Sequence, residues 1–149
     1  MMTCKCIRGF TIVELMITLI IIAILAAVAF PSYQESVLKT KRTEGRAALM
    51  KTMQQQERYY SLHTTYLTFS STSIDANEKR FSWFSGENAQ SSFYEISAQS
   101  CKDKSLRDCV LVTAQPGTTK VNVHYRDPKC GKLSLNSSGE KTAEADGCW

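Results

Sequence analysis

The sequence lacks the residue patterns that an enzyme active site or a metal centre requires. It has no glycine-rich phosphate loop, no nucleophile paired with a base and no Cys-x2-Cys knuckle, and its histidines, His63 and His124, stand alone. We therefore expect no catalytic residue, no metal and no cofactor, and interpret the protein as a non-enzyme. Internal repeats and Gly/Ser linkers are also missing, and 149 residues suffice for one ordinary domain.

Charge is almost absent from the N-terminal part of the chain. Between Phe10 and Phe30 the only charged residue is Glu14. A helix of this length spans roughly 31 Å, about the thickness of the hydrocarbon core of a bilayer. The segment is therefore predicted to cross a membrane.

The basic residues Lys5 and Arg8 precede Gly9, and the apolar run follows it. A secretory signal peptide is cleaved after its apolar run, whereas cleavage at Gly9 would retain the helix. A lone carboxylate in an apolar helix costs a few kcal/mol in a membrane and needs a partner. For Glu14, the amine that cleavage creates at Phe10 is the obvious one.

The stretch GFTIVELMITLIIIAILAAVAFPSYQE, residues 9–35, strongly resembles the N-terminus of type IV pilins. The resemblance implies that a prepilin peptidase cuts between Gly9 and Phe10, that Phe10 is N-methylated, and that Glu14 neutralises the terminal amine of a neighbouring subunit during assembly. It also implies that the protein lies in the inner membrane before it joins other pilin subunits in the extracellular pilus of a Gram-negative bacterium. The alternative is an ordinary signal anchor in which Glu14 has no role.

We predict an α+β fold, in which a long N-terminal helix packs on a four-stranded antiparallel sheet with a disulfide-bounded C-terminal loop. The expected parts are a leader (1–9), a membrane and fibre-core helix (10–33) and a globular headpiece (34–149). Within the headpiece, an amphipathic helix runs to about residue 60, a loop to about 90, and the sheet with the C-terminal loop from 91 to 149. The helical face that packs on the sheet comprises Leu38, Gly45, Leu49, Met53 and Tyr60. At Gly45 we favour close packing against a strand over a hinge.

Alternating or β-branched residues predict the four strands, which are SFYEISAQ, CVLVTAQ, TKVNVHYR and KLSLN. Cys4 and Cys6 belong to the leader, which leaves four cysteines in the exported part, an even set that indicates two disulfides. Three pairings are possible, and proximity in the chain favours Cys101–Cys109 and Cys130–Cys148. The tail from Lys129 to Trp149 also resembles the disulfide-bounded C-terminal loop of many pilins.

Basic residues gather in the predicted loops, near Phe81, Trp83 and Phe84. They are Lys79, Arg80, Lys102, Lys104, Arg107, Lys129 and Lys132. Loops at one sheet edge would join them into one stripe suited to double-stranded DNA, which binds basic side chains through its phosphates and stacks on aromatic ones. The alternative is that these are ordinary solvated loop residues, because a net charge of +4 by itself identifies no partner.

The two disulfides and the basic loops around them resemble the competence pilins of neisseriae, minor pilins that act as DNA-uptake receptors in natural transformation. We expect a minor pilin that binds DNA. A structural or adhesive pilin is the second hypothesis. A pseudopilin of a secretion system is the third, and it is disfavoured because the tail has only scattered acidic residues, Glu140, Glu144 and Asp146, in place of an acidic calcium-binding loop.

Overall fold

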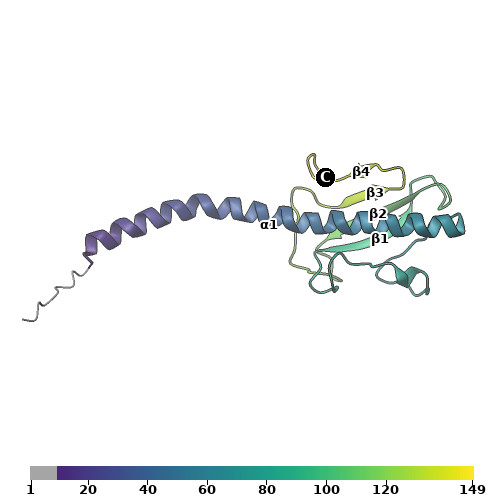
Figure 1. Ribbon diagram of the computed structural model, residues 1–149, viewed down its shortest axis with the longest axis horizontal. Coiled ribbons are helices and arrows are strands. Elements are labelled where there is room, and N and C mark those ends of the chain that lie inside the picture. Colours follow the sequence, from purple (N-terminus) through teal and green to yellow (C-terminus); the bar gives the residue numbers. More distant parts are fainter. Residues whose placement is uncertain (1–9) are drawn as a thin grey trace, which may run out of the picture. The chain divides into compact units, whose positions relative to one another are not determined.

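The computed structural model describes residues 10–149, and its contacts divide into two units with the boundary between Val37 and Leu38. The main elements are a 52-residue helix, α1 (Ile12–His63), and a sheet of β1 (Tyr94–Ser100), β2 (Val110–Pro116), β3 (Leu133–Asn136) and β4 (Lys141–Thr142) (Figure 1). A short 3-10 helix, η1 (Glu78–Arg80), lies in the connection between α1 and β1. From here on, the word headpiece refers to the second of these units, residues 38–149, and no longer to the expected range 34–149.

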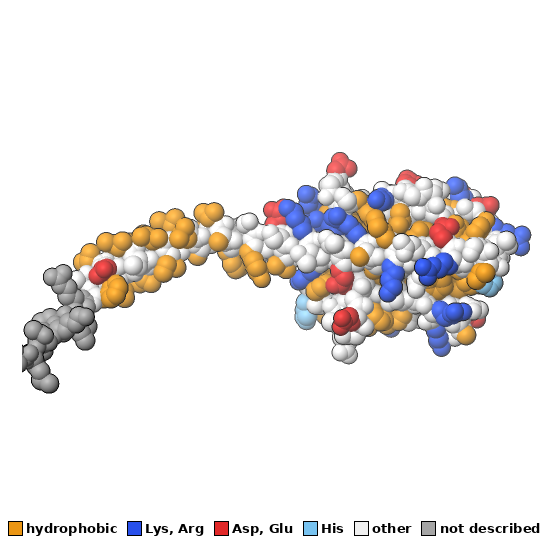
Figure 2. All heavy atoms as spheres, viewed as in Figure 1, with side chains coloured by type: hydrophobic (Ala, Val, Ile, Leu, Met, Phe, Trp, Pro, Cys, Tyr) orange, Lys and Arg blue, Asp and Glu red, His pale blue; other side chains and the backbone are white. Residues whose placement is uncertain are grey.

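In the first unit, α1 presents apolar side chains on all its faces. Figure 2 shows this part covered by hydrophobic side chains, with almost no charge among them. The hydroxyl of Thr11 accepts a hydrogen bond of 3.2 Å from the backbone N–H of Glu14, which caps the start of the helix. The helix continues through Pro31 without interruption. It is long and apolar enough to cross a membrane, and its most apolar stretch buries nothing within the protein.

In the headpiece, α1 becomes amphipathic, as the sequence pattern predicts. Leu49 is fully buried, while Leu38, Met53 and Tyr60 pack partly buried against the core. At Gly45, an added Cβ would lie 2.8 Å from Cδ2 of Tyr94 on β1. The prediction of close packing at this glycine is therefore confirmed, because a larger residue would press on the ring of the buried Tyr94.

The sheet is antiparallel throughout, in the order β1-β2-β3-β4. Ser100 pairs with Val110 at one end of the β1–β2 hairpin, and Tyr94 pairs with Pro116 at the other. In β1 and β2, alternate residues are buried against α1, which is the pattern of a sheet with one face on the core. The fold class is therefore the predicted one.

One of the predicted strands is wrong. The segment TKVNVHYR, residues 119–126, forms turns, and the fourth strand is instead the short β4. Val121 and Tyr125 are buried, and Tyr125 meets the ring of Phe93, the residue before β1, edge-on at 5.1 Å. Val123, between them in the alternating pattern, is 43% exposed, so the alternation in the sequence corresponds neither to strand pairing nor to alternating burial.

The long connection between α1 and β1 covers the outer edge of the sheet. Isolated bridges join Phe69 to Ala98 and Phe84 to Glu95, and the backbone N–H of Ile96 donates to the carbonyl of Trp83 at 2.7 Å. These contacts pair backbone groups of β1 that an exposed edge strand would leave free.

Two disulfides close the remaining loops. Cys101 is bonded to Cys109 across the β1–β2 loop, and Cys130 is bonded to Cys148 around β3 and β4. Both bonds join the cysteines that the proximity argument favours.

Candidate nucleic-acid interface

The sheet has two ends that carry different loops. We call the end where β1 finishes and β2 begins, at Ser100 and Val110, the distal end. The proximal end is where Tyr94, Pro116 and Leu133 lie. Since β1 has seven residues, the two ends are about 20 Å apart.

The disulfide-closed loop of residues 101–109 holds three of the candidate basic residues at the distal end. Its backbone is fixed by a bond of 3.2 Å from the N–H of Lys104 to the carbonyl of Cys101, and by the hydroxyl of Ser105, which donates to Asp108 at 2.6 Å. Lys102, Lys104 and Arg107 are exposed. The loop therefore displays its cations on a rigid frame.

This loop is also joined to the end of α1. The N–H of Tyr66 donates to the carbonyl of Leu106 at 2.9 Å, and the hydroxyl of Tyr66 donates to Glu57 of α1 at 2.9 Å. The side chain of Leu106 packs against the core. The 101–109 loop and the last turns of α1 therefore lie together at the distal end.

The candidates Lys79 and Arg80 lie on η1. The chain before η1 is fixed by the carboxylate of Asp75, which accepts a hydrogen bond of 2.7 Å from the N–H of Asn77. Phe81 anchors the other side, because its ring stacks on Phe69 at 5.0 Å and Phe69 is paired with Ala98 near the end of β1. The structure therefore brings Lys79 and Arg80 toward the distal end.

Lys129 and Lys132 do not join this group. Leu133 pairs with Ala114, so β3 starts at the proximal end, and Lys132 immediately precedes it. The single stripe that the sequence suggested is therefore wrong, because antiparallel pairing returns the chain to the opposite end before β3 begins. Figure 2 shows basic side chains at both ends of the headpiece.

The aromatic residues beside Lys79 and Arg80 are structural. Phe81 is buried, and Trp83 and Phe84 are half-buried, with their rings edge-on at 5.2 Å. The exposed aromatic surface of this region comes instead from α1, where the ring of His63 stacks on Tyr59 at 4.0 Å. The sequence signal for this pair is the spacing of four residues on a helix, which places both rings on one face.

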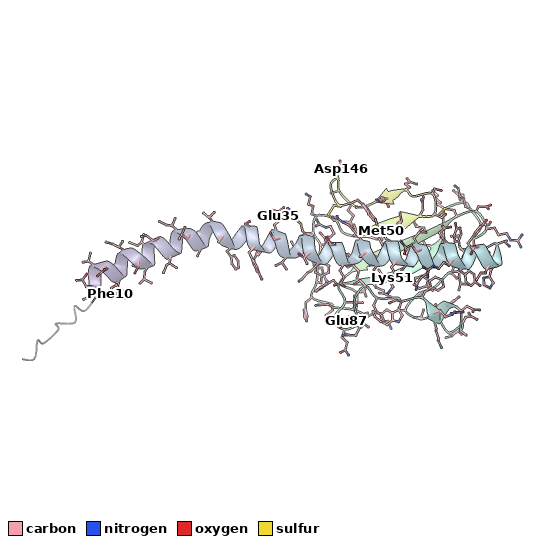
Figure 3. The ribbon with its side chains drawn as sticks, viewed as in Figure 1. Phe10, Glu35, Met50, Lys51, Glu87 and Asp146 are labelled. Carbon is pink, nitrogen blue, oxygen red and sulfur yellow. A yellow bond between two sulfur atoms is a disulfide. The ribbon has the colours of Figure 1, made fainter. Side chains whose placement is uncertain are left out.

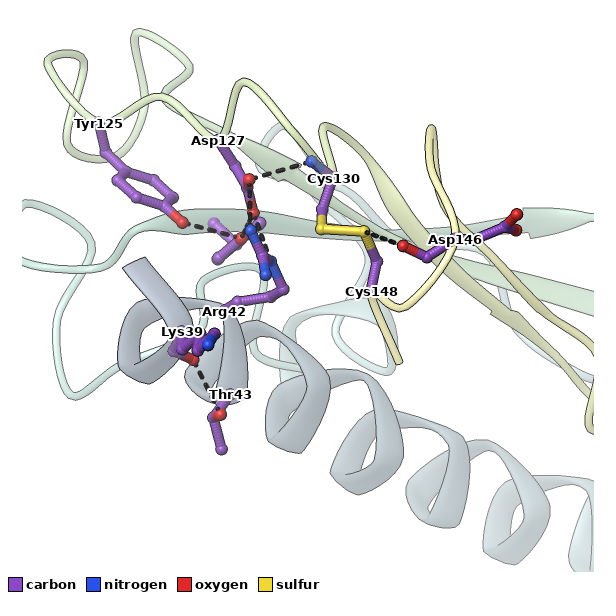
Figure 4. Close-up of polar contacts among 9 residues, drawn as sticks. Lys39, Arg42, Thr43, Tyr125, Asp127, Cys130, Asp146 and Cys148 are labelled. Atoms are coloured by element: carbon purple, nitrogen blue, oxygen red, sulfur yellow. Dashed lines mark hydrogen bonds and ion pairs between the residues drawn. A yellow bond between two sulfur atoms is a disulfide. The ribbon is translucent and has the colours of Figure 1, made fainter. Parts of the chain in front are cut away.

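A buried ion pair joins α1 to the segment that precedes β3 (Figure 4). Arg42 of α1 donates from Nε and Nη2 to the two carboxylate oxygens of Asp127, each at 2.8 Å. Asp127 also accepts from the N–H of Cys130 at 3.0 Å and from the hydroxyl of Tyr94 at 3.1 Å. The Tyr94 hydroxyl lies 3.0 Å from that of Tyr125.

Both charges of this pair are almost fully buried, at 5% exposure each. Burial by itself raises the pKa of Asp127, but the hydrogen bonds from Arg42 and Cys130 outweigh it, so the pKa is lowered. The hydrogen bond to Asp127 raises the pKa of Arg42. Burial, together with the bond to Tyr125, raises the pKa of Tyr94. Sequence reasoning missed this network, because a helical arginine and a loop aspartate 85 residues apart carry no local signal.

The processing and assembly residues lie at the other extreme of the chain. Gly9 is outside the described residues, Phe10 is exposed, and Glu14 stands in the first turn of α1. Across the part of the chain that the structure describes, no group of three or more metal-ligating side chains comes together.

An N-terminal processing motif, an apolar helix and a helix-on-sheet headpiece closed by a C-terminal disulfide together define a type IV pilin. Residues 4–30 match the model of the prokaryotic N-terminal methylation motif. Residues 31–134 match a second family model, described as type IV minor pilin ComP, DNA uptake sequence receptor. That match covers more than two thirds of the chain, which belongs to this family.

Curated relatives are similar over the N-terminal part. A type IV major alpha-pilin of Moraxella bovis is 51% identical over 47 residues, which is 30% of each chain. The type IV major pilin protein PilA of Myxococcus xanthus is 37% identical over 62 residues, or 42% of this chain and 28% of PilA. The chain therefore spans less than a third of the length of these relatives.

Two solved structures are similar over 75% of the chain. A type IV pilin from Shewanella oneidensis has 22% identity and a TM-score of 0.47, with 97% of that chain covered. The non-core minor pilin PilV of Neisseria meningitidis has 20% identity and a TM-score of 0.47, with 91% of that chain covered.

Proposed function

We propose that this chain is a minor subunit of a type IV pilus that binds double-stranded DNA for uptake in natural transformation. The observation that carries the proposal is the family match over residues 31–134, which includes all seven candidate basic residues and lies beyond the N-terminal segment that pilins share. The exposed cations at the distal end supply a chemical basis for it.

The distal group is the proposed contact surface. It consists of Lys79, Arg80, Lys102, Lys104 and Arg107. Lysine and arginine neutralise phosphates and release counterions, so the logarithm of the affinity falls with the logarithm of the salt concentration by about 0.9 for each phosphate contact. Lys129 and Lys132 are a separate pair, which a duplex reaches only if it lies along the length of the sheet.

The test is a gel shift with the full chain in nonionic detergent micelles, across a salt series and several duplex sequences. We expect Arg80→Ala, Lys102→Ala and Lys104→Ala each to weaken binding and to lower the salt slope by about one. Lys51→Ala is the matched control, because Lys51 is an exposed cation of α1 outside the distal group (Figure 3). The double variant of Lys129 and Lys132 should change binding less than the distal variants.

Absence of duplex binding by the wild-type chain at low salt would contradict the DNA proposal. The structural or adhesive pilin would then be the better interpretation. If the Lys129 and Lys132 variant weakens binding as much as the distal ones, the interface extends along the sheet.

We further propose that prepilin peptidase cuts between Gly9 and Phe10, that Phe10 is then N-methylated, and that Glu14 contacts the terminal amine of a neighbouring pilin. The methylation motif over residues 4–30 supports the processing step. In the first turn of the helix, the lone carboxylate of Glu14 is suited to pair with that amine. Gly9→Ser should block maturation, seen as an unprocessed mass, and normal maturation of this variant would contradict the proposal.

A further inference from the structure

A hollow of about 310 Å³ lies where the last turns of α1 face η1. One side is formed by Arg58, Tyr59 and His63 of α1, and the other by Arg80 and Phe81. Its volume is at the lower limit for small-molecule sites, which suits one small planar ligand better than a peptide.

The helical side of the hollow carries a stack of two aromatic rings. The rings of Tyr59 and His63 are stacked at 4.0 Å with an angle of 13° between their planes. A hydrogen bond of 3.0 Å between Nδ1 of His63 and the carbonyl of Tyr59 fixes the histidine ring, whose side chain is otherwise exposed. Phe81, which also lines the hollow, meets the Tyr59 ring edge-on at 6.4 Å. A planar group entering the hollow therefore meets rigid aromatic rings.

The charge of the hollow is purely positive. Arg58 and Arg80 line it from opposite sides, and no carboxylate lines it. Among residues 10–149, neither guanidinium takes part in a salt bridge. Leu62, 80% exposed, adds an apolar rim. The arrangement is suited to a ligand that has one flat apolar ring and one anionic group.

We propose that the hollow receives a single unpaired nucleotide of bound DNA, with its base stacked on the free face of the His63 ring, whose other face lies on Tyr59, and with its phosphate between Arg58 and Arg80. The inference rests on the proposed function and extends it, because Arg80 belongs both to the distal group and to the hollow. Arginine matches phosphate geometry, and bases of any sequence stack on aromatic side chains. A paired base is already stacked and enters only at a cost of a few kcal/mol, so a nucleotide that is already unpaired is preferred.

Three duplexes of the same sequence test the proposal with the full chain in nonionic detergent micelles. The first is fully paired, the second carries one bulged 2-aminopurine, and the third carries one bulged abasic nucleotide. We expect the 2-aminopurine duplex to bind about fivefold or more tightly than the other two, which corresponds to the lower range of base–aromatic stacking. Its fluorescence should fall on binding, because stacked 2-aminopurine is quenched.

Variants separate the stacking surface from the general attraction for DNA. His63→Ala should remove the preference for the bulged base and leave the paired duplex within about twofold. His63→Phe keeps a ring at the same position and should retain the preference, and Lys51→Ala should change neither. Arg58→Gln should weaken the bulged duplex more than the paired one. His63 is exposed, so its variants fold even where a change at Tyr59 disturbs the packing around Phe81.

Equal affinity for the three duplexes, with unchanged fluorescence, overturns this inference while paired-duplex binding still supports the proposed function. Failure of the wild-type chain to bind the paired duplex contradicts the proposed function instead. The free 2-aminopurine deoxynucleotide is the remaining probe. If it quenches as strongly as the bulged duplex at equal concentration, the hollow is a site for free nucleotides and its assignment to DNA is overturned.

Discussion

Replacing Asp127 by alanine should destabilise the headpiece more than replacing its partner, Arg42. Asp127→Ala removes the acceptor of four hydrogen bonds, two from Arg42, one from Cys130 and one from Tyr94, and leaves the guanidinium buried without an opposite charge. Arg42→Ala leaves a carboxylate that still accepts from Cys130 and Tyr94. The two single variants therefore differ in how well the remaining charge is satisfied.

The expected magnitude follows from the burial of the pair. Breaking a buried ion pair by removal of one partner costs about 3–5 kcal/mol, and Asp127→Ala should fall in this range. Arg42→Ala leaves the carboxylate with the hydrogen bonds from Cys130 and Tyr94, so it should cost about 1–2 kcal/mol less, which is of the order of one hydrogen bond to a charged group. The double variant Arg42→Met with Asp127→Leu should cost less than Asp127→Ala alone, because no charge is left buried.

Urea unfolding followed by tryptophan fluorescence measures these differences. Both tryptophans, Trp83 and Trp149, lie in the headpiece, so the signal reports on this unit even when the full chain is held in micelles. A loss below about 1 kcal/mol for Asp127→Ala, or a larger loss for Arg42→Ala, would refute the reasoning.

The same network predicts a dependence on pH. Because the folded state lowers the pKa of Asp127 below its ordinary value of 3.8, the carboxylate stabilises the fold at pH values above about 4. This contribution is lost as the pH falls through the lowered pKa. The gap in stability between the wild type and Asp127→Ala should therefore be full at pH 7 and narrow in strong acid.

Two further changes test the packing and the distal loop. Gly45→Ala places a Cβ 2.8 Å from the ring of the buried Tyr94. We expect it to lower the free energy of unfolding by about 1–3 kcal/mol in the same urea assay. An unchanged unfolding midpoint would show that helix and sheet separate easily. Replacing Cys101 and Cys109 together by serine opens a loop whose ends are separated by 8 residues, which should lower the free energy of unfolding by about 2.5 kcal/mol. The variant should also bind the duplex more weakly, because the loop that carries Lys104 is no longer held rigid. Full binding by this variant would show that the rigid loop is not needed.

Features set by local sequence were predictable. The helix of the first unit follows from a continuous apolar run, and the packing at Gly45 follows from its place on the apolar face of the amphipathic helix. The two disulfides join the cysteines nearest in the chain. In each case the signal lies within a few turns of helix or one hairpin, where periodicity and short separation decide the structure.

The alternation of apolar residues at 119–126 predicted a strand that the structure does not form. Val121 and Tyr125 are buried, but Val123 between them is 43% exposed, so the alternation of apolar residues over 119–126 has no counterpart in burial. β4 escaped prediction because its two residues, Lys141 and Thr142, are exposed and carry no apolar signal.

The sequence by itself determined the membrane-suited helix, the processing motif and the basic character of the loops, since each depends on residues close together in the chain. Only the tertiary structure decided which basic residues lie together. Antiparallel pairing carries residues 129–132 to the proximal end, and packing of the α1–β1 connection against α1 places Arg80 at the same hollow as Arg58, 22 residues earlier in the chain. It also joins Arg42 to Asp127, because long-range contacts depend on strand register and helix packing, which local sequence patterns do not encode.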